Sequence, residues 1–122
     1  MAHVLLVDDD TNVLLTLAIA LRRQGHTVTV AQNGWQALCI LGREHFAFLI
    51  SDVKMPGMTG IELASRVHAL PDAPLIILTS ALEVDISGGI AEHFMPKPVD
   101  VSRLHEVLVH DTHQFGSKQH AA

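Results

Sequence analysis

Residues 48–60 read FLISDVKMPGMTG: an apolar run of strand length ends at Asp52, and a loop that contains two glycines follows. Three other apolar runs end in polar residues in the same way, at Asp8 and Asp9, at Thr79 and at Lys97. Crossover connections between parallel strands are right-handed, so the carboxyl ends of such strands share one edge of a sheet. The sequence therefore predicts that these polar side chains converge at a single site.

Apolar runs alternate with segments of helical period five times, a pattern typical of a parallel sheet with crossover helices. We expect strands at residues 3–7, 26–31, 47–51, 74–78 and 92–95. Continuous apolar runs indicate strands covered on both faces, which here are the first, third and fourth. The second run alternates apolar and polar residues, so we expect it at an edge.

Helices are expected at residues 11–24, 33–43, 61–70 and 99–111. Residues 81–91 hold two adjacent glycines, and each costs about 1 kcal/mol inside a helix. We therefore predict a fourth helix of five that is short or irregular. Residues 112–122 have no apolar period, so we divide the chain into a domain at 1–111 and a flexible tail or start of a linker at 112–122.

Composition excludes several classes of protein. The 122 residues are 48% hydrophobic and fit one domain, without the ~20-residue apolar stretch of a membrane span, so we expect a cytoplasmic location. The net charge is −5 and the basic residues are scattered, which argues against direct nucleic-acid binding. The spacing of the nine histidines, among them His105, His110 and His113, matches no tetrahedral metal site, so we interpret them as solvated helix and tail residues.

The converging side chains suggest a particular chemistry. Asp8, Asp9 and Asp52 would repel one another unless they share a cation, and hard oxygen ligands of this kind suit Mg²⁺. An aspartate beside a metal ion, an ammonium and a hydroxyl is what phosphoryl transfer to a carboxylate requires. We expect Asp52 to be the nucleophile, with Lys97 neutralising phosphoryl oxygens and Thr79 offering its hydroxyl to one of them. Taken alone, residues 8–10 fit a helix N-cap cluster equally well.

Four segments, LLVDDD at 5–10, SDVKMPGMTG at 51–60, ILTS at 77–80 and MPKP at 95–98, occur in an order that resembles a known family. From about residue 3 to 110 the chain resembles the response-regulator receiver domains of bacterial two-component systems. The resemblance implies a flavodoxin-like, doubly wound α/β fold with five parallel strands in the order 2-1-3-4-5 and five helices.

The resemblance also implies roles for individual residues. Asp52 would accept a phosphoryl group from the phosphohistidine of a sensor histidine kinase or phosphotransfer protein. The Mg²⁺ ligands would be Asp9, Asp52 and the backbone carbonyl of Lys54, with Asp8 assisting. Phe94 would be the switch aromatic that moves together with Thr79, and the Lys97–Pro98 peptide bond would be cis.

Three further expectations follow from the resemblance. The output partner is not identifiable; the chain is a stand-alone regulator or the N-terminal receiver of a longer transcriptional regulator, and phosphorylation could drive homodimerisation. Lys54 and Ala81 occupy positions that influence water access to the phosphoryl group, and they suggest slow self-dephosphorylation.

Two alternative functions remain open for the chain. One is a phosphatase or mutase, which would place an acid where Lys54 stands. The other is a degenerate receiver that serves only as a scaffold.

Overall fold

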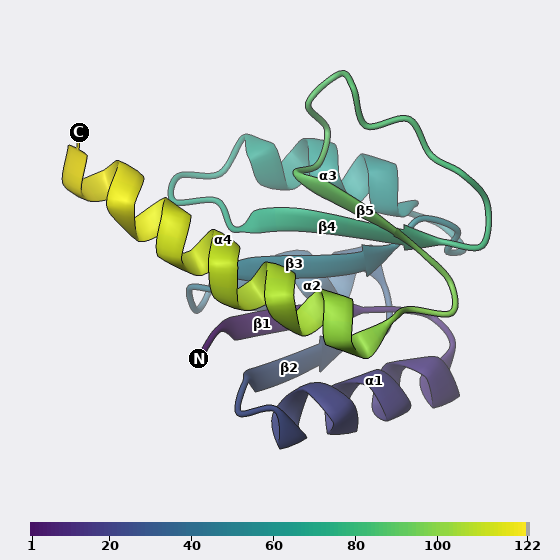
Figure 1. The fold of residues 1–122 in the computed structure, drawn as a ribbon. Helices are drawn as coiled ribbons and strands as arrows, with labels where there is room; N and C mark the ends of the chain where they lie inside the picture. The colour runs from purple at the N-terminus through teal and green to yellow at the C-terminus, as the bar shows by residue number, and fades with distance from the viewer. Residues whose placement is uncertain (122) are drawn as a thin grey trace.

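A computed structural model describes the backbone of residues 1–121 and the side chains of residues 1–111. Its centre is a parallel five-stranded sheet in the order β2-β1-β3-β4-β5 (Figure 1). The strands are β1 (His3–Val7), β2 (Thr27–Ala31), β3 (Phe48–Asp52), β4 (Leu75–Ser80) and β5 (His93–Pro96). The predicted doubly wound fold and strand order are confirmed, including β2 as an edge strand.

The described helices are α1 (Thr11–Arg23), α2 (Gly34–Leu41), α3 (Gly60–His68) and α4 (Val101–Ala121). Two hydrophobic clusters place them on opposite faces of the sheet. One cluster joins Leu49 of β3 to Leu63 of α3, and the other joins Ile50 of β3 to Leu14 of α1 and Leu104 of α4. Adjacent strand residues thus serve different cores, which explains why the central strands are apolar throughout.

Short polar side chains begin the first three helices. Asp10 caps α1 by accepting hydrogen bonds from the N–H groups of Asn12 and Val13 at 3.0 and 3.2 Å. Thr59 and Glu62 form a capping box at the start of α3. These caps fix the starts of the helices that follow β1 and β3, the two strands that carry the carboxylates.

The prediction of five helices is wrong, because the structure has four within residues 1–121. Residues 81–92, all of which are described, form bends and a turn where the sequence suggests a short or irregular helix. Gly89 has a φ of 83°, a conformation that interrupts a right-handed helix. Ser80 starts the loop by accepting a hydrogen bond from Leu82 N–H, and His68 of α3 hydrogen-bonds the Ile90 carbonyl. The irregularity itself agrees with the prediction.

The last helix differs from its expected bounds. α4 extends to Ala121, through most of the stretch that we expect to be a tail or linker, so the division at residue 111 stays a prediction. In Figure 1 this helix runs back across the sheet and projects beyond it. None of the helices in the described part of the chain is both long and apolar enough for a membrane span.

Candidate functional site

Three carboxylates meet at the carboxyl edge of the sheet. Asp8 and Asp9 follow β1, and Asp52 ends β3, which pairs directly with β1. Each carboxylate offers an oxygen, and these oxygens lie within 4.8 Å of one another. Asp8 and Asp52 are buried, with exposures of 4% and 7%, whereas Asp9 is exposed. The predicted convergence of the acidic residues is present in the structure.

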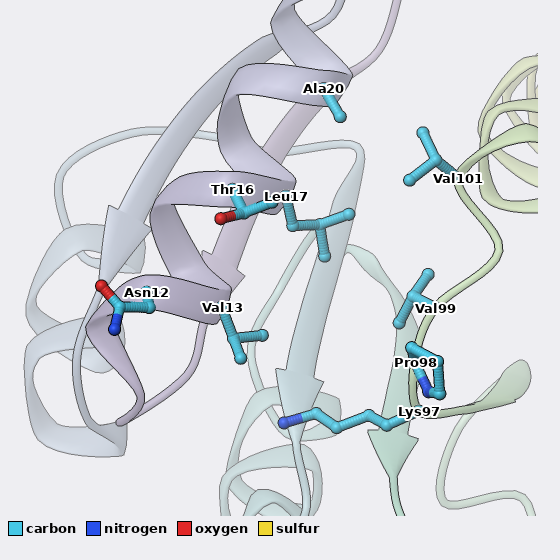
Figure 2. A pocket seen from close by; sticks show the side chains of 9 residues that line it. All are labelled: Asn12, Val13, Thr16, Leu17, Ala20, Lys97, Pro98, Val99 and Val101. Atoms are coloured by element: carbon cyan, nitrogen blue, oxygen red, sulfur yellow. The ribbon is translucent and has the colours of Figure 1, made fainter.

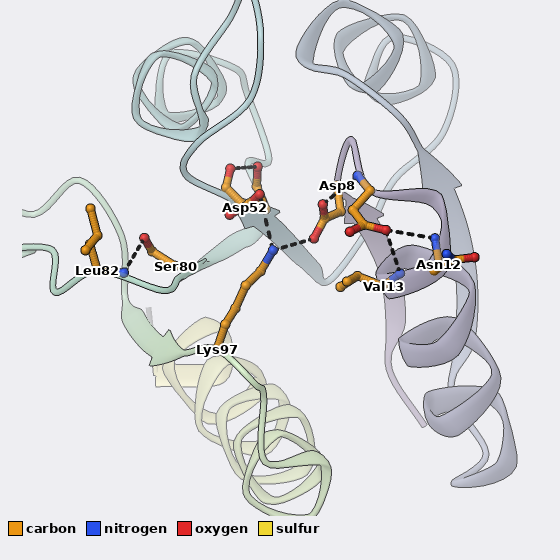
Figure 3. Close-up of polar contacts among 9 residues, drawn as sticks. Asp8, Asn12, Val13, Asp52, Ser80, Leu82 and Lys97 are labelled. Carbon is orange, nitrogen blue, oxygen red and sulfur yellow. Dashed lines mark hydrogen bonds and ion pairs between the residues drawn. The ribbon is translucent and has the colours of Figure 1, made fainter.

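Lys97 lies between two of these carboxylates. Its Nζ is 2.8 Å from Asp8 Oδ2 and 3.2 Å from Asp52 Oδ2. Dashed lines in Figure 3 mark both contacts. The lysine follows β5, and its backbone N–H donates to the Ser80 carbonyl at 2.9 Å. The Lys97–Pro98 peptide bond is cis, as predicted. Ser80 was not singled out in the sequence, because a backbone carbonyl that positions a neighbouring chain leaves no signal in residue type.

The electrostatics of the site follow from this crowding. Burial and the negative charge of Asp8 raise the pKa of Asp52 above its usual value, while Lys97 opposes them. Burial alone lowers the pKa of Lys97, but the hydrogen bond and charge of Asp8, together with those of Asp52, outweigh burial and raise it. Lys97 thus stays charged at neutral pH, and its ammonium contacts two of the three carboxylates.

The residues beside Asp52 lie where the sequence places them. Thr79 pairs in register with Asp52 on the neighbouring strand β4 and is buried at 3% exposure. The Thr79 carbonyl accepts a hydrogen bond from Val53 N–H at 2.9 Å, which ties the start of the next loop to β4. Phe94 of β5 is half-buried and packs against the core on the α2 and α3 side of the sheet.

The loop after Asp52 is held by contacts that the sequence pattern did not reveal. A Cβ on Gly60 would lie 2.1 Å from the Asp52 carbonyl oxygen, so only glycine fits there. Met58 is buried against Gly34 at the start of α2, where a Cβ would lie 2.6 Å from its sulfur. The side chain of Lys54 is exposed on this loop. The loop's backbone is therefore constrained on both sides of Lys54.

The donor set fits a hard divalent cation. Carboxylate oxygens from Asp8, Asp9 and Asp52 lie within the span of one ion's coordination sphere, and they carry more negative charge than Lys97 balances. Mg²⁺ binds through a few carboxylates and keeps several waters or phosphate oxygens as further ligands. An open site at a sheet edge, with one exposed and two buried carboxylates, meets those requirements.

Comparisons with known proteins agree with this geometry. The family description "Response regulator receiver domain" matches residues 4–109. Transcriptional regulatory protein GlrR of Escherichia coli (strain K12) is 34% identical over 112 residues, which are 88% of this chain and 25% of that protein. A 14.6 kDa protein of Leptolyngbya boryana is 42% identical over 108 residues, covering 83% of this chain and 82% of that protein. The chain thus spans about a quarter of the length of GlrR.

Two solved structures are similar in fold and in sequence. Chemotaxis response regulator CheY4 of Vibrio cholerae has a TM-score of 0.80 and 28% identity, covering 90% of this chain and 98% of that one. Response regulator protein TrrA of Thermotoga maritima, in complex with Mg(2+)-BeF, has a TM-score of 0.78 and 29% identity, covering 87% and 95%. Because the family match takes in the sheet from Val4 onward together with the start of α4, the chain belongs to the response regulator receiver domains, the signalling domains of two-component systems.

Proposed function

We propose that this receiver accepts a phosphoryl group on Asp52 from a phosphohistidine, with Mg²⁺ bound at the same edge of the sheet. The observation that carries the proposal is the contact of Lys97 Nζ with Asp8 and Asp52, at 2.8 and 3.2 Å, among three converging carboxylates. That arrangement offers a nucleophile and a fixed cation in one place.

The step is an exchange of bonds at phosphorus. An Asp52 carboxylate oxygen attacks the phosphorus, the new O–P bond forms, and the N–P bond of phosphohistidine breaks, with the electron pair leaving on the imidazole nitrogen. Lys97 neutralises charge on the phosphoryl oxygens, and the Thr79 hydroxyl donates to one of them. The location of Thr79, in register with Asp52 on the neighbouring strand, supports that role.

The metal ligands that we propose are Asp9, Asp52 and the backbone carbonyl of Lys54, with Asp8 assisting. Bound Mg²⁺ would supply positive charge shared between the carboxylates and the phosphoryl oxygens. The carboxylate cluster supports this assignment, and so does the Mg(2+)-BeF complex of the Thermotoga maritima relative. Asp8 holds the Lys97 ammonium and, through Oδ1, accepts a hydrogen bond from Asp10 N–H.

An apolar pocket of about 560 Å³ lies between α1 and the segment that follows Lys97 (Figure 2). Val13 and Leu17 of α1 face Val99 and Val101 across it, and Lys97 lies at one end. A helix of a histidine kinase or phosphotransfer protein that packs on this surface would bring its phosphohistidine beside the acceptor carboxylate. We propose this pocket as part of the docking surface for the phosphodonor.

Signalling would follow from a change around Thr79 and Phe94. We propose that Thr79 moves toward the new phosphoryl group and that Phe94, now half-buried, moves with it. The surface around β4 and β5 would then change for an output partner or a second copy of the chain. The irregular segment at 81–92 forms part of that surface, so its shape differs from one built on a regular helix.

The phosphorylated state should be long-lived. Lys54 and Ala81 are both exposed beside the site, and Ala81 has no carboxylate or amide to orient an attacking water. We expect slow loss of the phosphoryl group in Mg²⁺ and faster loss in Lys54→Ala. Rapid decay that Lys54→Ala leaves unchanged would contradict this assignment.

The setting of the domain is also part of the proposal. We propose a cytoplasmic receiver, as a stand-alone regulator or as the N-terminal part of a longer transcriptional regulator, with residues 1–111 forming the receiver and 112–122 leading out of it. Direct contact with nucleic acid is not expected of this chain, given its scattered basic residues.

The decisive experiment uses a small phosphodonor with Mg²⁺. Intact mass spectrometry should record one added phosphoryl group in the wild type and none in Asp52→Asn, whose folding is checked by circular dichroism. Size-exclusion chromatography of the same samples reports on dimerisation. If the wild type gains no mass, or folded Asp52→Asn gains as much, Asp52 is not the acceptor.

A further inference from the structure

The amino edge of the sheet holds a histidine pair that plays no part in the proposed phosphoryl transfer. His26 precedes β2, and its side chain is buried at 4% exposure. Its Nδ1 accepts a hydrogen bond from Ala2 N–H at 3.2 Å, and its Nε2 lies 2.8 Å from Nδ1 of His105 on α4. The pair joins α4 to the edge of the sheet opposite the carboxylates, where α4 has crossed back over the strands (Figure 1).

These contacts decide where the ring protons lie. Because Ala2 N–H is a donor, Nδ1 of His26 carries no proton, and neutral His26 holds its proton on Nε2. That N–H donates to Nδ1 of His105, which must also be unprotonated. The chain of two hydrogen bonds is therefore complete only when both imidazoles are neutral.

Any added proton breaks one of the two bonds. A proton on His26 goes to Nδ1 and displaces the bond from Ala2, whereas a proton on His105 goes to Nδ1 and faces the N–H of His26. Burial, the charge of His105 and the N-terminal ammonium lower the pKa of His26. From α1, the nearest charged contact with this strand is that of Arg22, which donates a hydrogen bond to the Val28 carbonyl of β2 at 2.8 Å.

A second histidine contacts α4 from the other side. His93, at the start of β5, is hydrogen-bonded to Asp111 of α4. A protonated imidazole binds a carboxylate more strongly than a neutral one. The two contacts therefore differ: a proton costs the histidine pair one of its hydrogen bonds, whereas the bond between His93 and Asp111, at the opposite edge strand, does not depend on an unprotonated ring.

We propose that His26 and His105 form a proton-sensing latch, which links Ala2 and α4 through two hydrogen bonds at the amino edge of the sheet at neutral pH and loses one of these bonds in acid. His93 and Asp111 hold α4 near β5 independently of this pair. His105 is a helix residue, as the sequence indicates, but it is half-buried and hydrogen-bonded to His26, which corrects the interpretation of it as solvated; the side chain of His113 lies outside the described residues.

The test follows the imidazoles and α4 in the same protein. Nitrogen-15 NMR of the full chain from ~pH 8 to ~pH 5 reports the tautomer and titration of each histidine. We expect the Nε2–H tautomer for His26 at neutral pH and a midpoint below the ordinary 6.5. Protection of the Ala2 amide, which donates to His26 Nδ1, should fall several-fold with that titration, and protection near Asp111 should change less.

Two variants separate the latch from a general effect of acid. His105→Gln keeps a hydrogen-bond acceptor that does not titrate, so its stability should fall less with decreasing pH than that of the wild type. His110→Gln makes the same change at an exposed position of α4 and should keep the wild-type dependence. The proposal is overturned if His26 titrates at or above 6.5, if the Ala2 amide keeps its protection, or if folded His105→Gln keeps the full pH dependence.

Discussion

Buried titratable groups lie at both edges of the sheet, but they are charged at one edge and neutral at the other. At the carboxyl edge, Asp8 and Asp52 stay close together, and Lys97 balances only part of their charge. At the amino edge, the two hydrogen bonds of His26, from Ala2 and to His105, form together only when both imidazoles are neutral. One edge thus retains an excess of negative charge that a bound cation would reduce, and the other satisfies its polar atoms within the fold.

The difference predicts opposite responses to pH. Because the pKa of Asp52 is raised, ionising this carboxyl destabilises the fold; the cost grows as pH rises from 3.8 to the raised pKa and is complete above it. Because the pKa of His26 is lowered, its stabilising effect is full above 6.5 and is lost as pH falls from 6.5 to the lowered pKa.

The largest loss of stability should come from adding a side chain at Gly60, which packs against the backbone of Asp52. Gly60→Ala puts a Cβ 2.1 Å from the Asp52 carbonyl oxygen, and relieving that overlap should cost about 3 kcal/mol of unfolding free energy. Gly57→Ala is the matched control, since its φ of 77° costs only about 1 kcal/mol and its Cβ meets no described atom within 4 Å. Urea denaturation measures both, and equal losses would refute the crowding at Gly60.

Metal binding should relieve the charge at the carboxyl edge. At a Mg²⁺ concentration about 100 times its dissociation constant, the wild type should gain about 2.7 kcal/mol of stability. Asp52→Asn should lose most of that gain, because one ligand and one negative charge are missing. Thermal unfolding with Mg²⁺ and with chelator measures the difference. A full gain in Asp52→Asn would remove Asp52 from the metal site.

Asp52→Asn should also stabilise the metal-free protein. With Asp8 still paired to Lys97, removing the second charge should raise the unfolding free energy by about 1 kcal/mol at neutral pH. The advantage should shrink as pH falls toward 3.8, where the wild-type carboxyl becomes protonated in both states. Urea titrations of both proteins across this pH range test the sign of the difference in unfolding free energy. The titration of His26 cancels in this difference, because both proteins contain it. An advantage that is independent of pH would contradict a charge effect.

The carboxyl edge was predictable from the sequence because its residues follow apolar runs that parallel strands bring together. Asp8, Asp9, Asp52, Thr79 and Lys97 were all placed correctly at that edge on this ground. Their chemical roles were inferred from residue type and resemblance, and the experiments on the acceptor and the metal test them.

The amino edge was not predictable in the same way. His26 and His105 are 79 positions apart, and neither belongs to a recognisable motif. Their contact depends on where α4 packs on the sheet, and the hydrophobic periodicity of the sequence does not specify that position. The count of helices failed for a related reason: the glycines weakened residues 81–92 as predicted, but whether a helical turn survives depends on its contacts with the core.

The smallest loss of stability is expected at Asp10, and it should distinguish this cap residue from Asp8 and Asp9, the other two acids after β1. Asp10 is the N-cap of α1, so Asp10→Ala should cost about 1 kcal/mol, whereas Asp10→Ser, which keeps an acceptor oxygen, should cost much less. Both variants should still gain one phosphoryl group by intact mass, because the Asp10 side chain accepts its hydrogen bonds from α1. Loss of the mass gain in stably folded Asp10→Ala would show that the cap and the metal site are not separable, and that all three acids serve the carboxyl edge.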